Sequence, residues 1–272
     1  MNKTMIVADI GINHNGNIEL IEQMIDVASS AGCDFVKFQK RDIDSCYTEE
    51  ELSSPRKSPW GSTFREQKEG LELQEWQYDM INKYCESRRI GWFASPWDIK
   101  SLDFLEKYEM PWLKIPSALI TNEEFLSACK KTKIPIIMST GMSTLEMVDS
   151  AVENCDPSVI LHCTSTYPSV PEELNLRAIL RFKERYPDRT IGFSNHNPGI
   201  IYIPIAVGLG ARVVEFHITM DRSMYGSDQA ASIEPEGVFK IVKYVRGIEK
   251  AMGDGMKRIY KSEEPIIKKL RR

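Results

Sequence analysis

The chain has 272 residues, of which 42% are apolar and 27% are charged, the composition of an ordinary globular protein. A formal net charge of −4 gives it no bulk attraction for nucleic acid or for a membrane surface. No apolar run approaches the ~20 residues that span a bilayer, and the amino-terminal residues lack a signal-peptide pattern. We therefore expect a cytoplasmic protein of enzyme size.

Short apolar strands alternate with amphipathic helices along the chain. Alternation of this kind predicts an α/β fold with a parallel sheet covered by helices. Eight repeats at this length favour a closed (β/α)8 TIM barrel over an open doubly wound sheet. The expected strands cover 5–11, 34–39, 90–95, 112–117, 135–140, 159–164, 190–195 and 212–218. The expected helices cover 18–32, 71–89, 98–108, 122–132, 144–155, 174–186, 199–210 and 235–252.

Two segments interrupt or follow this alternation. Residues 40–71 show no sustained periodicity and contain much Ser, Pro and charge, which is typical of a long functional or disordered excursion. Residues 253–272 are basic, and their pattern predicts a solvated terminal helix or arm, with an oligomer contact as the alternative. We therefore divide the chain into a barrel domain, 1–252, and a basic tail, 253–272.

The six cysteines are scattered and include no CxxC pair. Four of them fall within apolar helix or strand patterns, where cysteine behaves as a small buried hydrophobic residue. This distribution predicts buried thiols in a reducing compartment.

Polar side chains gather at the ends of the expected strands. In a TIM barrel the active site lies at the carboxyl ends of the strands, so these side chains are candidates for chemistry. No GxGxxG or GxxxxGK[ST] motif follows a strand, which argues against a nucleotide site. The candidates are Asp9, Lys37, Gln39, Ser95, Trp97, Lys114, Ser117, Ser139, Thr164, Ser165, Tyr167, Ser194, His196, Glu215 and His217.

Two histidines and two lysines are the most informative of these residues. His196 and His217 follow adjacent expected strands, where two imidazoles can bind one divalent metal and leave positions open for substrate. A hydrogen-bonded histidine at the edge of the core is the ordinary alternative for either one alone. Lys37 and Lys114 lie in two strands and would converge on one anion, such as a phosphate. The pattern alone leaves open a Schiff-base aldolase and a metal-dependent aldolase.

Eight segments in order resemble the motifs of one known family. They are VADIGINHNG, FVKFQ, ASPWD, KIPSA, MSTGM, LHCTSTYP, GFSNH and VVEFHITMDR with GSDQAAS, and they extend over residues 5–235. In these segments the chain resembles the sialic acid synthase family (N-acetylneuraminate synthase-like). The resemblance implies a barrel that condenses phosphoenolpyruvate with an aldose, such as N-acetylmannosamine. The products would be a sialic-acid-like 2-keto-3-deoxy sugar acid and phosphate.

The resemblance also implies a role for each matching residue. His196 and His217 would ligate a divalent metal, Mn²⁺ first and Mg²⁺ or Co²⁺ as alternatives. The implied catalytic residues are Asp9, Lys37, Lys114 and Tyr167, and the implied substrate-binding residues are Gln39, Ser95, Trp97, Ser117, Ser139, Thr164, Ser165, Ser194 and Asp228.

Three residues depart from the family pattern. Asn195 stands where the family has Asp, and Phe216 stands where many members have a basic residue. Leu119 stands where many members have an acid that could orient the attacking water. We also expect no antifreeze-like domain, which in the family caps the active site of a partner.

The expected partners are phosphoenolpyruvate and an aldose, a second copy of the chain in a homodimer, and a separate capping protein as a further candidate. Two other functions stay open. One is a different barrel aldolase that uses pyruvate, and the other is a non-catalytic ligand-binding relative.

Overall fold

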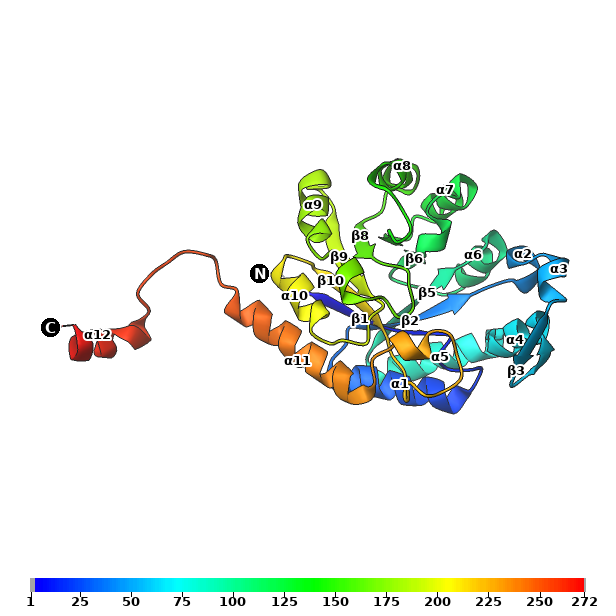
Figure 1. Cartoon of the computed structure of the whole chain (residues 1–272), viewed down its shortest axis with the longest axis horizontal. Helices are drawn as coiled ribbons and strands as arrows, with labels where there is room; N and C mark the ends of the chain where they lie inside the picture. Colours follow the sequence, from blue (N-terminus) through cyan, green and yellow to red (C-terminus); the bar gives the residue numbers. More distant parts are fainter. Residues whose placement is uncertain (1–2, 272) are drawn as a thin grey trace.

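A computed structural model of the chain describes residues 3–271. Within them, eight parallel strands close into a barrel in the order β1-β10-β9-β8-β7-β6-β5-β2, so the predicted TIM barrel is confirmed (Figure 1). The barrel strands are β1 (Met5–Gly11), β2 (Phe35–Lys40), β5 (Gly91–Pro96), β6 (Leu113–Ile115), β7 (Ile136–Ser139), β8 (Val159–Cys163), β9 (Thr190–Asn195) and β10 (Val213–His217).

A ring of helices surrounds the barrel, and several are shorter than the sequence pattern predicts. The expected helix over 71–89 begins only at Glu75, and the one over 98–108 ends at Leu105. Short 3₁₀ turns, η1 (Ser117–Leu119), η2 (Pro171–Glu173) and η3 (Gln229–Ala231), lie between them. The surrounding helices are α1 (Ile18–Ala31), α5 (Glu75–Arg88), α6 (Ile99–Leu105), α7 (Glu123–Lys131), α8 (Leu145–Cys155), α9 (Ala178–Arg185), α10 (Tyr202–Gly208) and α11 (Pro235–Ala251).

Side-chain alternation along the strands separates the core from the barrel interior. In β10, Val214 and Phe216 are fully buried in the apolar core, whereas Glu215 and His217 line a cavity inside the barrel. The same period of two applies in every strand, because successive side chains point to opposite faces. Polar side chains at alternate strand positions therefore meet inside the barrel without interrupting the apolar layer beneath the helices.

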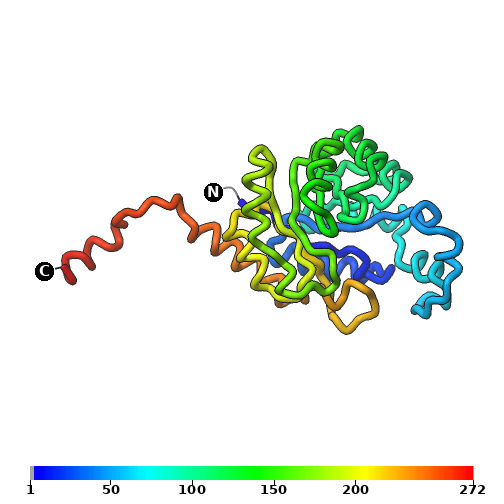
Figure 2. Tube along the Cα trace, turned by 45° about the horizontal axis from the view of Figure 1, so that its top comes forward, coloured from blue at the N-terminus to red at the C-terminus, as the bar shows by residue number. Residues whose placement is uncertain are grey.

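The segment expected to be a long excursion folds into short elements. These are too short to show a periodicity in the sequence, and two begin with a capping box, Thr48 with Glu51 and Thr63 with Glu66. Figure 2 shows this segment, hereafter the insertion (residues 41–71), at the opposite end of the molecule from the carboxyl terminus. Its elements are α2 (Ile43–Cys46), α3 (Glu49–Leu52), β3 (Pro55–Ser58), β4 (Gly61–Thr63) and α4 (Phe64–Leu71).

The chain after α11 leads away from the barrel (Figure 1). It contains η4 (Lys261–Glu263) and α12 (Glu264–Leu270), and almost all of its residues are exposed, as a solvated terminal arm should be. An oligomer contact through this arm stays a prediction. No helix within residues 3–271 combines the length and the apolar character that crossing a membrane requires. All six cysteines are free, and five of them are buried.

One arginine joins the end of the barrel chain to its beginning. Arg246 in α11 donates to the carbonyl oxygen of Thr4 at 2.7 Å and to Asp34 Oδ2 at 2.9 Å. Asp34 Oδ2 also accepts a hydrogen bond from the backbone N–H of Ile6 at 2.9 Å. Arg246 thus connects α11, the last helix of the barrel, to the segments that enter β1 and β2.

We expect Arg246→Met to lower the free energy of unfolding by about 1–3 kcal/mol, because it removes the guanidinium that donates to the carbonyl oxygen of buried Thr4 and to the partly buried carboxylate of Asp34. Urea denaturation followed by circular dichroism measures the change. Lys240→Met is the matched control, since Lys240 makes only an exposed pair with Glu236 on the same helix. Equal stability of the two variants would contradict the closing role of Arg246.

Candidate active site

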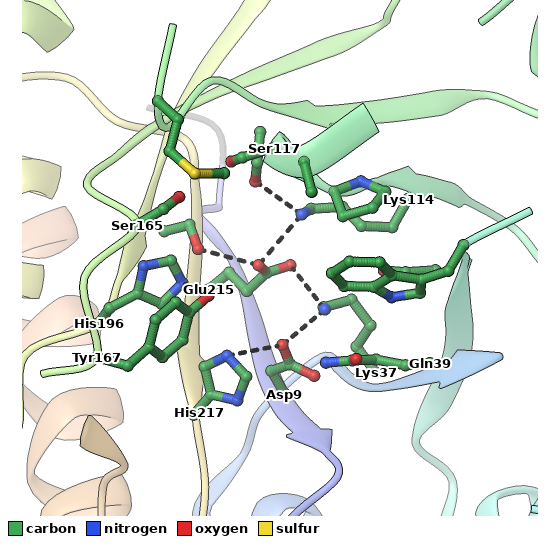
Figure 3. Close-up of a pocket in the computed structure, with 17 residues that line it drawn as sticks. Asp9, Lys37, Gln39, Lys114, Ser117, Ser165, Tyr167, His196, Glu215 and His217 are labelled. Atoms are coloured by element: carbon green, nitrogen blue, oxygen red, sulfur yellow. Dashed lines mark hydrogen bonds and ion pairs between the residues drawn. The ribbon is translucent and has the colours of Figure 1, made fainter. Parts of the chain in front are cut away.

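A cavity opens at the carboxyl ends of the strands and brings together almost all the predicted site residues (Figure 3). It contains about 570 Å³ of space, part of it open to solvent. Thr164 and Asp228 are the predicted residues that do not line it. Those that do are Asp9, Lys37, Gln39, Ser95, Trp97, Lys114, Ser117, Ser139, Ser165, Tyr167, Ser194, His196 and His217.

Glu215 connects the two lysines at the centre of this cavity, as Figure 3 shows. Its carboxylate lies 3.4 Å from Lys114 Nζ and 3.9 Å from Lys37 Nζ, and it accepts a hydrogen bond from Ser194 at 3.0 Å. Lys37 Nζ also lies 2.6 Å from Asp9 Oδ2. All four charged side chains are at least 96% buried, so they form a closed network of two cations and two anions.

The register of the sheet creates this network. Asp9 in β1 pairs with Lys37 in β2 on one side and with His217 in β10 on the other. Glu215 precedes His217 by two residues and therefore points into the barrel from the same strand. The sequence placed Glu215 at a strand end, but we assigned it no role. The alternation of side chains along the strand was the signal in the sequence, because it predicts that Glu215 and His217 point to the same side.

Charge compensation governs protonation in the network. Burial acts to raise the pKa of Glu215, but Lys114 and Lys37 overcome burial and lower that pKa to about 2. Burial acts to lower the pKa of Lys37, yet Asp9 and Glu215 outweigh it and raise that pKa. For Lys114 burial prevails over the attraction of Glu215, so its pKa is lowered. The carboxylate of Glu215 is thus ionised throughout the physiological range.

Several buried polar atoms of the cavity have no hydrogen-bond partner within the described protein. Buried polar groups in folded proteins are nearly always paired, so an unpaired set in one cavity marks where water or a polar ligand binds. These atoms belong to residues of three strands, β1, β5 and β10, or of the turn that follows β5. They are Asp9 Oδ1, Ser95 Oγ, Trp97 Nε1, Glu215 Oε2 and His217 Nδ1.

His196 and His217 lie on one side of the cavity with their ring centroids 5.6 Å apart. The Nδ1 of His196 lies 2.6 Å from the carbonyl oxygen of Thr164, which assigns the ring proton to Nδ1 and leaves a lone pair on Nε2. Burial, followed by the neighbouring His217, lowers the pKa of His196 to about 4, so the ring is neutral. The protonated hydroxyl of Tyr167 donates to this Nε2 at 2.9 Å.

The two imidazoles therefore fit a divalent metal. A neutral ring with an available nitrogen is the form that binds metals, and His217 Nδ1 is one of the unpaired buried atoms. No cluster of three or more His, Cys, Asp or Glu suited to a metal occurs among residues 3–271. The remaining coordination positions would thus fall to substrate or solvent.

The two predicted residues outside the cavity act on its histidines. Besides accepting from His196 through its carbonyl, Thr164 donates its hydroxyl to the carbonyl oxygen of Glu173 at 2.8 Å. Its role here is to orient an imidazole. Asp228 Oδ2 lies 3.9 Å from His217 Nδ1, on the loop that follows β10.

The other two histidines of the chain serve the structure. His14 Nδ1 accepts from the backbone N–H of Gly16 at 2.9 Å, and burial lowers its pKa to about 4. His162 lies 2.8 Å from the carbonyl oxygen of Leu174 and stacks on Phe193. Both are hydrogen-bonded histidines at the edge of the core, the ordinary role of this residue type.

A model of the NeuB family matches residues 24–257. The chain belongs to the NeuB family. It is 36% identical to human N-acetylneuraminate-9-phosphate synthase over 97% of this chain and 76% of that protein. It is 35% identical to the N,N'-diacetyllegionaminic acid synthase of Legionella pneumophila, over 98% of this chain and 78% of that one.

A solved structure extends the likeness to the fold. The N-acetylneuraminic acid synthetase of Leptospira borgpetersenii, determined with citrate, superposes with a TM-score of 0.86 at 29% identity. The match covers 98% of this chain and 91% of that one. The family predicted from the motifs is confirmed.

We expect Glu215→Gln to lower the free energy of unfolding by about 3–5 kcal/mol, because it leaves Lys114 buried without a carboxylate. Urea denaturation at neutral pH measures this loss. Glu236→Gln, at an exposed position of α11, is the matched control and should unfold as the wild type does. A loss below about 1 kcal/mol would show that the network does not need its central carboxylate.

Proposed function

We propose that this member of the NeuB family condenses phosphoenolpyruvate with an amino-sugar aldose, giving a sialic-acid-like 2-keto-3-deoxy sugar acid and phosphate. The observation that carries the proposal is the network of Lys37, Lys114, Asp9 and Glu215 beside two metal-competent imidazoles in one cavity. The named relatives are sialic acid and legionaminic acid synthases, which supports the same reaction for this chain.

Lys114 and the serines around it suit the phosphate of phosphoenolpyruvate. Lys114 Nζ donates to Ser139 Oγ at 2.7 Å, and Ser117 Oγ accepts from the backbone N–H of Gly141 at 2.9 Å. A Cβ at Gly141 would lie 2.0 Å from Ser165 Oγ and 3.0 Å from Ser117 Oγ, so only glycine lets these hydroxyls converge. A lysine with hydroxyl and amide donors is a usual phosphate cradle.

His196 and His217 would hold the divalent metal, with Mn²⁺ as our first candidate. When bound, the metal would polarise the aldehyde oxygen of the acceptor sugar. Thr164 fixes the tautomer of His196, and the Tyr167 hydroxyl already lies where an oxygen ligand of the acceptor would approach. Lys37, held by Asp9, supplies positive charge beside that position.

The overall reaction joins C3 of phosphoenolpyruvate to the aldehyde carbon. Water adds to C2, and the bond between C2 and the phosphate oxygen breaks to release phosphate. Leu119 provides no carboxylate to orient that water, which leaves the task to Asp9 Oδ1 or Glu215 Oε2, both of which lack a hydrogen-bond partner within the described protein. Preorganised charges of this kind act most strongly in a buried site.

We expect phosphate release when the protein is incubated with phosphoenolpyruvate, Mn²⁺ and a panel of amino-sugar aldoses. Lys114→Met should lower kcat/KM by about 10²–10³-fold, the usual effect of removing one preorganised donor. Lys100→Met is the control, because Lys100 makes only an exposed pair with Asp42.

Related measurements distinguish the proposed condensation from the two alternative functions. Borohydride trapping of a pyruvate adduct on a lysine would indicate a Schiff-base aldolase instead. Binding of phosphoenolpyruvate without turnover of any aldose would indicate a ligand-binding relative. The homodimer and a separate capping protein stay predictions that a mass measurement in solution tests.

Metal binding gives an independent check. Protein stripped with a chelator should rebind about one Mn²⁺ per chain in an equilibrium titration, because two imidazoles face one cavity. His196→Ala should abolish this binding. His162→Asn, which alters a buried histidine away from the cavity, should retain it if the variant folds. Unchanged stoichiometry in His196→Ala would exclude the assigned site.

A further inference from the structure

Cys163 is a buried thiol next to the serines of the phosphate cradle. It is the last residue of β8 and is 5% exposed. Its register partner in β9 is Ser194, which lines the cavity, so Cys163 also points into the barrel. The thiol does not line the cavity itself. It contacts a residue that does, Ser117, with 3.3 Å between Sγ and Oγ.

The hydroxyl of Ser117 meets two groups of the protein. It accepts a hydrogen bond from the backbone N–H of Gly141 at 2.9 Å, and its other contact is the Cys163 thiol. A serine hydroxyl has one proton and two lone pairs, whereas a thiol can donate or accept. The amide can only donate, so it occupies one lone pair. The direction of the bond with Cys163 therefore decides where the Ser117 proton points.

Two neighbouring serines show both possible outcomes. Ser194 donates its proton to Glu215 at 3.0 Å, so that proton is not available to a ligand. Ser139 accepts from the ammonium of Lys114 at 2.7 Å. An ammonium has no lone pair, so the Ser139 proton stays free to point at a ligand. A phosphate oxygen only accepts hydrogen bonds, and a serine can therefore serve it only through its proton.

The chemistry of an anion selects one direction for the contact between Cys163 and Ser117. When Cys163 donates, protein donors fill both lone pairs of Ser117 Oγ, and the Ser117 proton is left for the ligand. When Ser117 donates instead, its proton goes to sulfur, which is a weak acceptor, and its second lone pair faces the phosphate oxygens. Only the first arrangement attracts an anion. Ser117 lies on the same side of the cavity as Lys114, where that anion would bind (Figure 3).

We infer that Cys163 is a positioning residue for the bound phosphate: its thiol donates to Ser117 and thereby directs the Ser117 proton at the ligand. The inference rests on the proposed function for phosphoenolpyruvate as the ligand, but the same geometry serves any phosphate beside Lys114. Ser95 independently marks the cavity as a binding site, because it is 1% exposed and its Oγ has no hydrogen-bond partner within residues 3–271. Cys163 itself would not touch the substrate.

Calorimetry with phosphoenolpyruvate and with inorganic phosphate, each without an acceptor sugar, tests this inference. Cys163→Ala should raise the Kd of both ligands by about 3- to 10-fold, the effect of one hydrogen bond that is no longer oriented. In the assay of the proposed reaction, the KM for phosphoenolpyruvate should rise by a similar factor while kcat is unchanged. Cys163→Ser should recover affinity, because its hydroxyl can donate in place of the thiol.

A double-mutant cycle separates this positioning from a general effect on the barrel. In a Ser117→Ala background, Cys163→Ala should not weaken phosphate binding further, because the hydroxyl that the thiol directs is already gone. Cys129→Ala is the matched control. Cys129 in α7 is a fully buried free cysteine that does not line the cavity, so its truncation should keep the wild-type affinity.

Four results would overturn the inference. They are wild-type affinity in Cys163→Ala, no recovery in Cys163→Ser, additive losses in the cycle, and an equal loss in Cys129→Ala.

The outcomes also separate this inference from the proposed function. Absence of turnover with every aldose would contradict the condensation reaction. The binding measurements would still decide the inference, because inorganic phosphate binds without any catalysis. Turnover of an aldose together with unchanged phosphate affinity in Cys163→Ala would overturn the inference and leave the condensation reaction standing.

Discussion

Glu215 forms ion pairs with both Lys37 and Lys114, so two lysine ammonium groups lie close to one carboxylate inside the barrel. Burial alone would drive a lysine to release its proton and a glutamate to keep one. For Lys37 and Glu215 the attraction of an opposite charge within about 4 Å outweighs burial. The cavity is thus polar but closely balanced, and a ligand anion can enter it by exchanging contacts with Glu215 instead of meeting an isolated cation. The network joins β1, β2, β6 and β10 across the interior of the barrel.

The sequence predicts more of the chemistry at strand ends than of the contacts between strands. Periodicity and the positions of the strand ends were enough to predict one shared cavity for Lys37, Lys114, His196 and His217, because the parallel strands of a barrel present their carboxyl ends at one rim. The lysine partners of Glu215 lie on β2 and β6, which do not pair with β10, so closure of the barrel brings them together and no local pattern encodes the contact. The same applies to backbone contacts, such as that between His196 Nδ1 and the carbonyl oxygen of Thr164, which the sequence does not predict.

The residues that depart from the family pattern affect the site unequally. Phe216 is fully buried in the apolar core, on the face of β10 opposite Glu215, so it does not touch the cavity. Asn195 is occupied by a local turn, in which its Nδ2 donates to the carbonyl oxygen of Asn197 at 2.6 Å. Leu119 lies at the end of η1, beside Ala118 of the cavity lining. Leu119 itself lines a neighbouring hollow, so none of the three side chains lines the cavity.

The barrel strands and the insertion differ in how firmly their residues are held. Strand residues hold reacting groups in fixed positions, since each strand is hydrogen-bonded on both sides. The insertion consists of short capped elements whose contacts with the barrel run through a few side chains, among them the Gln67 bond to Tyr225. Changes in such a segment cost little stability. The insertion can therefore change while Glu215 and its two lysines stay fixed on the barrel strands.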